Sequence, residues 1–234
     1  MSARRERYKN ILQMMEERLT FGEDISFSAA EAYKLLRTNI LFALPDAQRC
    51  RVIGVTSAGR GEGKSTTALN LSHMLAEAGE RVLLIEADMR LPAISRRLGL
   101  RAAPGLSNVL AGLRNAGEAI HKSGLHEHLQ IVSSGDIPPN PSELLGSRQM
   151  NVLMETVSGS YDFIVMDLPP VNGVPDALVA SKLTDGMIVV VRQRYATRRA
   201  LAEAMQKLQY AEAKVLGFVT TYSEIQTKGK KYKG

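Results

Sequence analysis

A glycine-rich stretch that ends in Lys64 and Ser65 is the part of this sequence whose residue types most clearly indicate chemistry. Gly59, Gly61 and Gly63 alternate with other residues there, and glycine allows backbone conformations that a side chain forbids. Consecutive backbone N–H groups can then face one anion, and the positive end of a following helix adds to the attraction. Lys64 would reach the β- and γ-phosphates of a nucleotide, and the Ser65 hydroxyl would hold Mg²⁺.

The predicted phosphate loop, residues 58–66, departs from the usual motif G-x-x-x-x-G-K-[ST] only in having Ala58 at the first glycine. Residues 51–56 before it form a β-branched run typical of a buried strand, and the residues after it carry helical spacing. A plain turn between strand and helix would leave the Lys-Ser-Thr run unexplained. The expected nucleotide-binding residues are Gly59, Arg60, Gly61, Glu62, Gly63, Lys64, Ser65 and Thr66.

Acidic residues stand at the ends of two further predicted strands. Glu86 and Asp88 close the strand expected over residues 81–87, and Asp167 closes the one over residues 161–167. The carboxyl ends of parallel strands meet at one edge of a sheet, where ligands bind. A strand that simply leaves the core for solvent could account for one carboxylate at its end, but it accounts less well for two. Asp167 ends an apolar run, as a Walker B carboxylate does, and could hold Mg²⁺ through water.

Predicted strands and helices alternate along nearly the whole chain, which indicates an α/β fold with a mostly parallel twisted sheet and helices on both faces. The expected strands cover residues 51–56, 81–87, 129–132, 161–167, 185–191 and 214–220. The expected helices cover residues 29–44, 142–157, 176–183 and 197–210, with short helical pieces at 94–98, 105–113 and 116–121.

Composition divides the chain into a central domain, residues 26–222, and two basic ends. Residues 1–25 include a loosely amphipathic stretch at 4–19, and residues 223–234 form a polar tail expected to be flexible. No apolar run reaches the roughly 18 residues that span a bilayer. No apolar stretch of the signal-peptide kind follows the basic start, and Cys50 is the single cysteine, so a cytoplasmic protein is expected.

Three segments resemble the Walker A, Walker A′ and Walker B motifs of bacterial tyrosine kinases of the CpsD/CapB (BY-kinase) family: SAGRGEGKSTTALNLS, VLLIEADMRLP and YDFIVMDLPPV. The likeness extends over roughly residues 26–220. It implies a P-loop NTPase fold of the deviant-Walker class, which MinD/ParA-like ATPases share. Those ATPases usually carry a lysine early in the loop. Gly59 and Arg60 stand there in this chain, which favours the kinase branch.

The resemblance implies a kinase that uses ATP and Mg²⁺ to phosphorylate tyrosines near its own C-terminus, in trans, and that regulates capsule or exopolysaccharide assembly. It assigns catalysis to Lys64, Glu86, Asp88 and Asp167, and the metal to Ser65, Asp88 and Asp167. Glu86 takes the place of the aspartate thought to activate the tyrosine hydroxyl. The expected acceptors are Tyr232, in the lysine-rich tail, and Tyr222 as a minor one.

A charged helix face is the expected oligomerisation surface. Glu31, Lys34 and Arg37 lie three residues apart, and periodicity alone would make this an exposed polar face. They resemble the family's E-x-x-R-x-x-R oligomerisation motif, with Lys34 in place of its first arginine. The resemblance further implies a ring-like homo-oligomer and a separate transmembrane activator whose cytoplasmic tail docks on the kinase at the inner face of the membrane. No nucleic-acid partner is expected.

Two other functions remain open at this level. One is an ATP-driven dimerising switch of the septum- or plasmid-partition type, against which the missing early lysine counts. The other is an ATP-binding regulatory scaffold without tyrosine transfer, which Glu86 and the tyrosine-poor tail favour.

Overall fold

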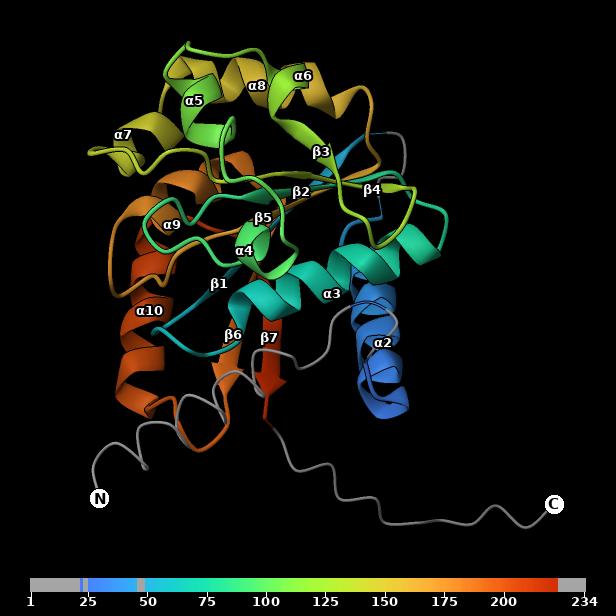
Figure 1. The fold of residues 1–234 in the computed structure, drawn as a ribbon. Coiled ribbons are helices and arrows are strands. Elements are labelled where there is room, and N and C mark those ends of the chain that lie inside the picture. The colour runs from blue at the N-terminus through green and yellow to red at the C-terminus, as the bar shows by residue number, and fades with distance from the viewer. Residues whose placement is uncertain (1–21, 23–24, 46–48, 223–234) are drawn as a thin grey trace, which may run out of the picture.

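The computed structural model describes residues 22, 25–45 and 49–222, and these fold around one seven-stranded sheet (Figure 1). The strand order is β3-β4-β2-β5-β1-β6-β7, and every pair is parallel except β3 with β4. The strands are β1 (Arg51–Ser57), β2 (Val82–Glu86), β3 (Ile120–Lys122), β4 (Leu129–Val132), β5 (Phe163–Asp167), β6 (Gly186–Arg192) and β7 (Val215–Thr221). The mostly parallel sheet predicted from the sequence is confirmed.

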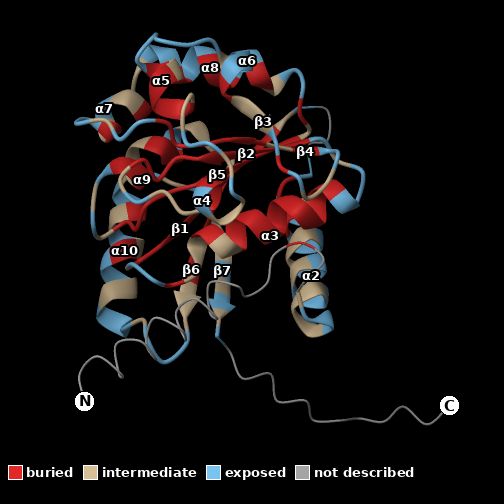
Figure 2. Ribbon diagram, viewed as in Figure 1, coloured by how far each residue is buried: buried red, intermediate tan, exposed pale blue. Residues whose placement is uncertain are grey.

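Helices cover both faces of the sheet, so its central strands are buried on both sides (Figures 1 and 2). One core lies against α2 (Phe27–Ala43), α3 (Lys64–Glu77) and α4 (Ile94–Arg97). The other lies against helices on the opposite face: α5 (Leu106–Leu110), α7 (Pro141–Leu145), α8 (Arg148–Ser158), α9 (Asp176–Ala180) and α10 (Arg198–Tyr210). The short α6 (Ala116–Ala119) precedes β3, and the 3-10 turn η2 (Ser181–Leu183) follows α9.

The strand order places the predicted functional strand ends side by side. β1 lies between β5 and β6, and β5 also pairs with β2. In this register Asp167 is opposite Glu86 on one side and Val55 on the other. The phosphate loop after β1 and the acidic ends of β2 and β5 therefore open onto the same edge of the sheet, as a ligand site in an open parallel sheet requires.

Helix α2 packs on the body through a small part of its surface. Ser26 caps it, with the Ser26 Oγ accepting a hydrogen bond from the Ala29 N–H at 3.3 Å, so the helix begins two residues earlier than predicted. Ile40 is its buried residue, whereas Leu35 and Phe42 are exposed. The predicted oligomerisation face lies on this helix.

Two predicted helices are wrong in extent. Residues 116–121 were expected to be helical, but the helix stops at Ala119 and the chain continues as the antiparallel edge strand β3, because its backbone pairs with β4. The helix expected over residues 142–157 is divided into α7 and α8. Gly146 ends the first, and the Ser147 hydroxyl caps the second by accepting from the Met150 N–H at 3.2 Å.

Some predictions fall outside the described residues: the amphipathic stretch at 4–19, the tail 223–234 and therefore Tyr232. Among the residues that are described, no helix combines the length and the apolar character needed to cross a membrane.

Candidate active site

A cavity of about 200 Å³ opens at the carboxyl ends of β1, β2 and β5. Its walls come from the phosphate loop, the segment after β2 with α4, and the loop after β5. The lining residues are Arg60, Gly61, Gly63, Lys64, Ser65, Thr66, Asp88, Arg90, Leu91, Ala93, Arg97, Pro169, Pro170, Gly173 and Val174. Six of the eight residues predicted to bind nucleotide are among them.

The loop takes the form that the glycine spacing predicts. Gly61 and Gly63 have φ values of 73° and 94°, which residues with a side chain rarely adopt. Gly63 is also the N-cap of the 14-residue α3 and supplies no side chain to cover the helix end. The positive end of the α3 dipole therefore faces the cavity without a capping group, as an anion site needs.

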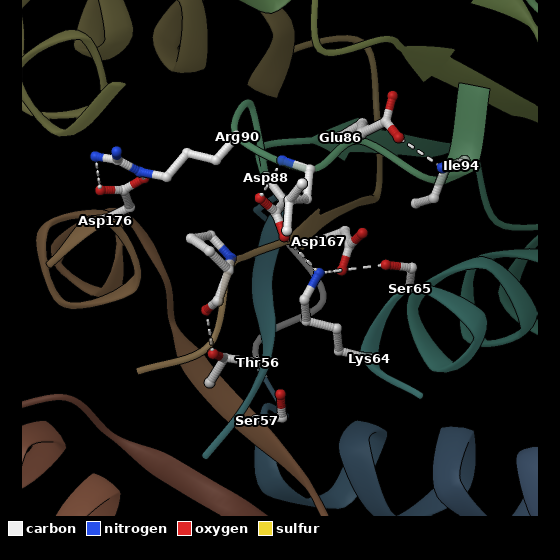
Figure 3. Close-up of polar contacts among 12 residues, drawn as sticks. Thr56, Ser57, Lys64, Ser65, Glu86, Asp88, Arg90, Ile94, Asp167 and Asp176 are labelled. Carbon is white, nitrogen blue, oxygen red and sulfur yellow. Dashed lines mark hydrogen bonds and ion pairs between the residues drawn. The ribbon is translucent and has the colours of Figure 1, made fainter. Parts of the chain in front are cut away.

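Lys64 is the central cation of the site and spans two carboxylates (Figure 3). Its Nζ lies 2.8 Å from Asp88 Oδ2 and 3.5 Å from Asp167 Oδ1, and it donates a hydrogen bond to Ser65 Oγ at 3.3 Å. All three partners are predicted metal-binding residues. The structure thus brings together four of the predicted site residues within reach of one amine.

These charges alter one another's pKa values. Burial alone would lower the pKa of Lys64, but the charges of Asp167 and Asp88 more than offset it, and the net pKa is raised. The pKa of Asp167 is also raised, chiefly because the carboxyl is fully buried; Lys64 opposes that shift, and the charges of Asp88 and Glu86 add to it. Lys64 is therefore held protonated by its carboxylates, while burial makes the ionised form of Asp167 costly.

The residues present fit a magnesium ion that depends on a nucleotide. Both carboxylate oxygens of Asp167 are buried, and apart from the ion pair with Lys64 at 3.5 Å neither has a close hydrogen-bond partner within the described chain. A hydroxyl with carboxylates is the oxygen set that Mg²⁺ uses together with substrate phosphates and water. The described residues hold no group of three or more His, Cys, Asp or Glu side chains suited to a metal. Nucleotide phosphates would have to complete the coordination.

Glu86 does not face the cavity, so the structure does not place it where the expected tyrosine activator should be. Its side chain is fully buried and turns toward α4 (Figure 3). Oε1 accepts from the N–H groups of Ile94 at 2.5 Å and Ser95 at 3.3 Å, and Oε2 accepts from that of Ser134 at 3.2 Å. The extra methylene relative to aspartate carries the carboxylate to these donors. Of the three predicted carboxylates, only Asp88 lines the cavity.

Gly59 and Glu62 were predicted to bind nucleotide but support the loop from its inner side. The buried Glu62 accepts from the Gly59 N–H at 2.6 Å and from the Arg192 N–H at 3.3 Å. The Thr221 hydroxyl donates to the Glu62 carbonyl at 2.7 Å. These bonds tie the loop to the ends of β6 and β7. The Gly59 N–H is therefore already used within the loop.

Sequence reasoning missed two arginine contacts at the cavity. Arg90 forms a two-pronged ion pair with the buried Asp176, at 2.8 and 3.1 Å. Arg97, at the end of α4, donates to Thr66 Oγ1 at 2.7 Å. Arg90 comes two residues after Asp88 in the sequence, and this closeness is a signal that could have placed it at the cavity. No local pattern marks Asp176 or Arg97, because only the packing of α9 and α4 brings them to the site.

The predicted oligomerisation residues lie away from this cavity. Lys34 pairs with Glu31 along the helix at 2.8 Å, and both side chains are about half exposed. Arg37 donates to the Met74 carbonyl of α3 at 2.9 Å, so it also fastens α2 to the body. Tyr222 follows β7 directly and is exposed, with its ring 3.9 Å from the Arg192 guanidinium.

Comparison with known proteins places this geometry in a family. Residues 50–216 match the family model described as an AAA domain. The chain is 38% identical over 190 residues to the tyrosine-protein kinase YwqD of Bacillus subtilis (strain 168), covering 81% of this chain and 79% of the relative.

Solved structures agree. The kinase domain of the Escherichia coli tyrosine kinase ETK matches with a TM-score of 0.79 and 30% identity, over 83% of this chain and 75% of that one. The septum site-determining protein MinD of Pyrococcus horikoshii OT3, solved with Mg-ADP, matches with a TM-score of 0.62 and 26% identity, over 73% and 70%. The P-loop fold of the deviant-Walker class is thereby confirmed. The chain is also 32% identical over 210 residues to the tyrosine-protein kinase CpsD of Streptococcus agalactiae, covering 86% of this chain and 90% of the relative, and it belongs to the bacterial tyrosine-protein kinases of the CpsD family.

Proposed function

We propose that this kinase transfers the γ-phosphoryl group of ATP, with Mg²⁺, to tyrosines in its own C-terminal tail, and does so between copies of the chain. The observation that carries the nucleotide part is the position of Lys64, between Asp88 and Asp167 at the uncapped start of α3. A cation, a hydroxyl and two carboxylates at that point suit a magnesium-bound polyphosphate.

The chain's own residues divide the work. The α3 start and Lys64 would bind the phosphates, while Ser65, Asp88 and Asp167 would hold Mg²⁺, which when bound neutralises charge on the transferred group. Phosphoryl transfer depends mainly on positioning and charge stabilisation. Asp88 is the carboxylate at the cavity and so the one within reach of an entering tyrosine hydroxyl.

A phosphorylation assay tests this proposal. Purified protein is incubated with ATP, with and without Mg²⁺, and phosphotyrosine is detected by antibody and by mass spectrometry. Asp88→Asn is the inactive comparison, and Arg96→Ala, a change at an exposed residue of α4, is the matched control. Phosphotyrosine that needs Mg²⁺ and Asp88 supports the proposal. Nucleotide binding with no phosphotyrosine would instead support the regulatory scaffold.

The family resemblance supplies the setting that we propose for this activity. A transmembrane activator would recruit the kinase through its cytoplasmic tail to the inner face of the membrane, where the kinase would regulate capsule or exopolysaccharide assembly. Rings would form through the α2 face that carries Glu31, Lys34 and Arg37. The exposed Leu35 and Phe42 beside these charges support self-association through this helix.

A further inference from the structure

The buried Glu86 is a charged residue that has no role in the phosphoryl transfer proposed above. It has three backbone N–H donors, two of them at the start of α4, and none of its bonds points into the cavity. A buried carboxylate needs such donors to offset its desolvation. Because two of these donors belong to α4, we expect Glu86 to act through this helix.

Helix α4 is too short to hold itself in place. It has only four residues, and a helix of that length gains too few hydrogen bonds to be stable alone. Two contacts fix its start: the buried Ile94 side chain in the core, and the hydrogen bonds that the Ile94 and Ser95 N–H groups donate to Glu86. Glu86 thus connects the end of β2 to α4.

Arg97 is the residue that α4 delivers to the cavity. Its guanidinium donates to Thr66 Oγ1 at 2.7 Å, next to Lys64 and Ser65, and it lines the cavity. Arg90 at the same cavity is paired with Asp176, whereas Arg97 has no carboxylate partner in the described chain. A guanidinium with several unused donors beside a polyphosphate site is suited to binding phosphate.

We propose that Arg97 binds the phosphates of the nucleotide, and that Glu86 is the positioning residue that holds α4, and with it Arg97, at the cavity. This proposal rests on the nucleotide site described above. Because the wild-type affinity for ATP is measured in the same assay, failure of the site itself is distinguishable from failure of the role of Arg97.

The first experiment measures nucleotide affinity by calorimetry, without turnover, for ATP, ADP and AMP. Arg97→Ala is expected to weaken ATP binding by about ten- to hundredfold, the range for a hydrogen bond to a charged group. The loss is expected to shrink from ATP to AMP, and Arg97→Lys is expected to recover part of it. Arg96→Ala, the exposed neighbour, is expected to bind as the wild type does.

The second experiment separates positioning from proton transfer at Glu86. In Glu86→Gln the amide oxygen can still accept from Ile94 and Ser95 and only the bond from the Ser134 N–H is lost, whereas in Glu86→Asp the carboxylate is one methylene too short to reach α4. The proposal expects Asp to weaken ATP binding and Gln to retain most of it. A general base predicts the reverse: Gln would lower kcat and change its pH profile while leaving ATP affinity intact.

A double-mutant cycle connects the two residues. If Glu86 acts through Arg97, the Glu86→Asp/Arg97→Ala protein binds ATP no more weakly than Arg97→Ala alone. Thermal unfolding of every variant identifies any general loss of fold. Equal affinity of wild type and Arg97→Ala, an equal loss for ATP and AMP, or fully additive effects would each overturn the proposal.

Discussion

Lys64 Nζ lies 2.8 Å from Asp88 Oδ2 and forms an almost fully buried ion pair, with 12% and 4% of the two side chains exposed. The same amine is the group expected to bind the nucleotide's phosphates. Without nucleotide, Lys64 therefore neutralises the carboxylates that would otherwise repel each other and an incoming polyphosphate. When phosphates and a metal enter, they take over these charges. Lys64 is a structural counter-ion as well as a phosphate ligand.

Replacing Lys64 is thus expected to reduce stability as well as activity. Lys64→Met leaves Asp88 and Asp167 buried without their cation, and breaking such a pair costs about 3–5 kcal/mol. Urea unfolding without nucleotide measures this, and phosphotransfer is expected to be lost. Arg60→Met, a change in the same loop at an exposed residue, is the control for the unfolding measurement. A Lys64→Met protein as stable as the wild type would contradict the counter-ion role.

Asp167→Asn is expected to separate metal binding from stability. The pKa of Asp167 is raised by burial, so its ionised form disfavours the folded state at pH 7. The carboxyl group of Asp167 therefore contributes to folding stability only at low pH, where it is protonated, and this contribution is lost as pH rises through the folded-state pKa. Asparagine removes that buried charge while Lys64 keeps Asp88. We expect an unfolding free energy equal to or above that of the wild type at pH 7.

Nucleotide binding by Asp167→Asn is expected to lose its dependence on Mg²⁺. Calorimetry with ATP, in the presence of Mg²⁺ or of a chelator, measures the two affinities. The wild type is expected to bind more tightly with Mg²⁺, and the variant about equally in both. An undiminished benefit of Mg²⁺ in the variant would reject a metal role for Asp167.

The sequence predicts the phosphate loop and the acidic strand ends because both depend on local rules. The alternating glycines and the apolar run that ends in Asp167 can be recognised in the sequence without knowledge of the tertiary packing. The direction of Glu86 is not, because β2 sets only its backbone and α4 supplies its donors. Arg97 was missed for the same reason: its partner Thr66 is far away in the sequence. The edge strand β3 depends likewise on pairing with β4.

Acid is expected to weaken the contact between Arg81 and Asp162, which joins the starts of β2 and β5. The side chain and the N–H of Arg81 donate to the Asp162 carboxylate at 2.7 and 2.8 Å, and the side-chain bond chiefly lowers the pKa of Asp162 from 3.8. A lowered pKa gives stability that is present above pH 3.8 and lost as pH falls through the folded-state value.

Asp162→Asn is therefore expected to be less stable than the wild type at pH 7, with the difference shrinking below about pH 4. Chemical unfolding at several pH values measures it. Glu155→Gln, a change at an exposed residue of α8, should show no such trend. A gap that stays constant as the pH falls would mean that the charge of Asp162 is irrelevant.

Charge reversal on α2 tests the proposed ring. Among the described residues Glu31 pairs with Lys34 alone, on the surface, and such a pair adds little to monomer stability. Glu31→Arg is expected to leave the monomer folded and to weaken self-association roughly tenfold or more, because like charges would meet across the interface. Sedimentation velocity over a range of concentrations measures this. Arg37 is a poorer target because it also binds α3.

Glu155→Arg makes the same charge change on α8 and is the control for Glu31→Arg. Identical sedimentation of wild type and Glu31→Arg at every concentration would mean that the charged residues of α2 form an ordinary exposed face with no role in self-association.

The phosphate acceptor is decided by reach rather than by charge. The lysines around Tyr232 would be attracted by free carboxylates at the site, but Asp88 and Asp167 are paired with Lys64, and Glu86 accepts hydrogen bonds from backbone N–H groups. Together with the arginines that line the cavity, Lys64 offsets much of that attraction. What remains is geometry: Tyr232 follows Tyr222 by ten residues, a span of at most about 35 Å. Tyr222 itself stacks on Arg192.

We therefore expect Tyr232 to be the main acceptor, Tyr222 a minor one, and transfer to run between chains. A mixture tests all three points. Asp88→Asn supplies an inactive chain with an intact tail, and Tyr232→Phe supplies an active chain without the main acceptor. Peptide mass spectrometry should find phosphate chiefly on Tyr232 of the inactive chain. Replacing Lys230, Lys231 and Lys233 with serine should change the rate less than about threefold, since interactions between exposed charges are each worth little. Phosphate confined to the active chain would show transfer in cis, and phosphate mainly on Tyr8 or Tyr195 would overturn the tail as the substrate.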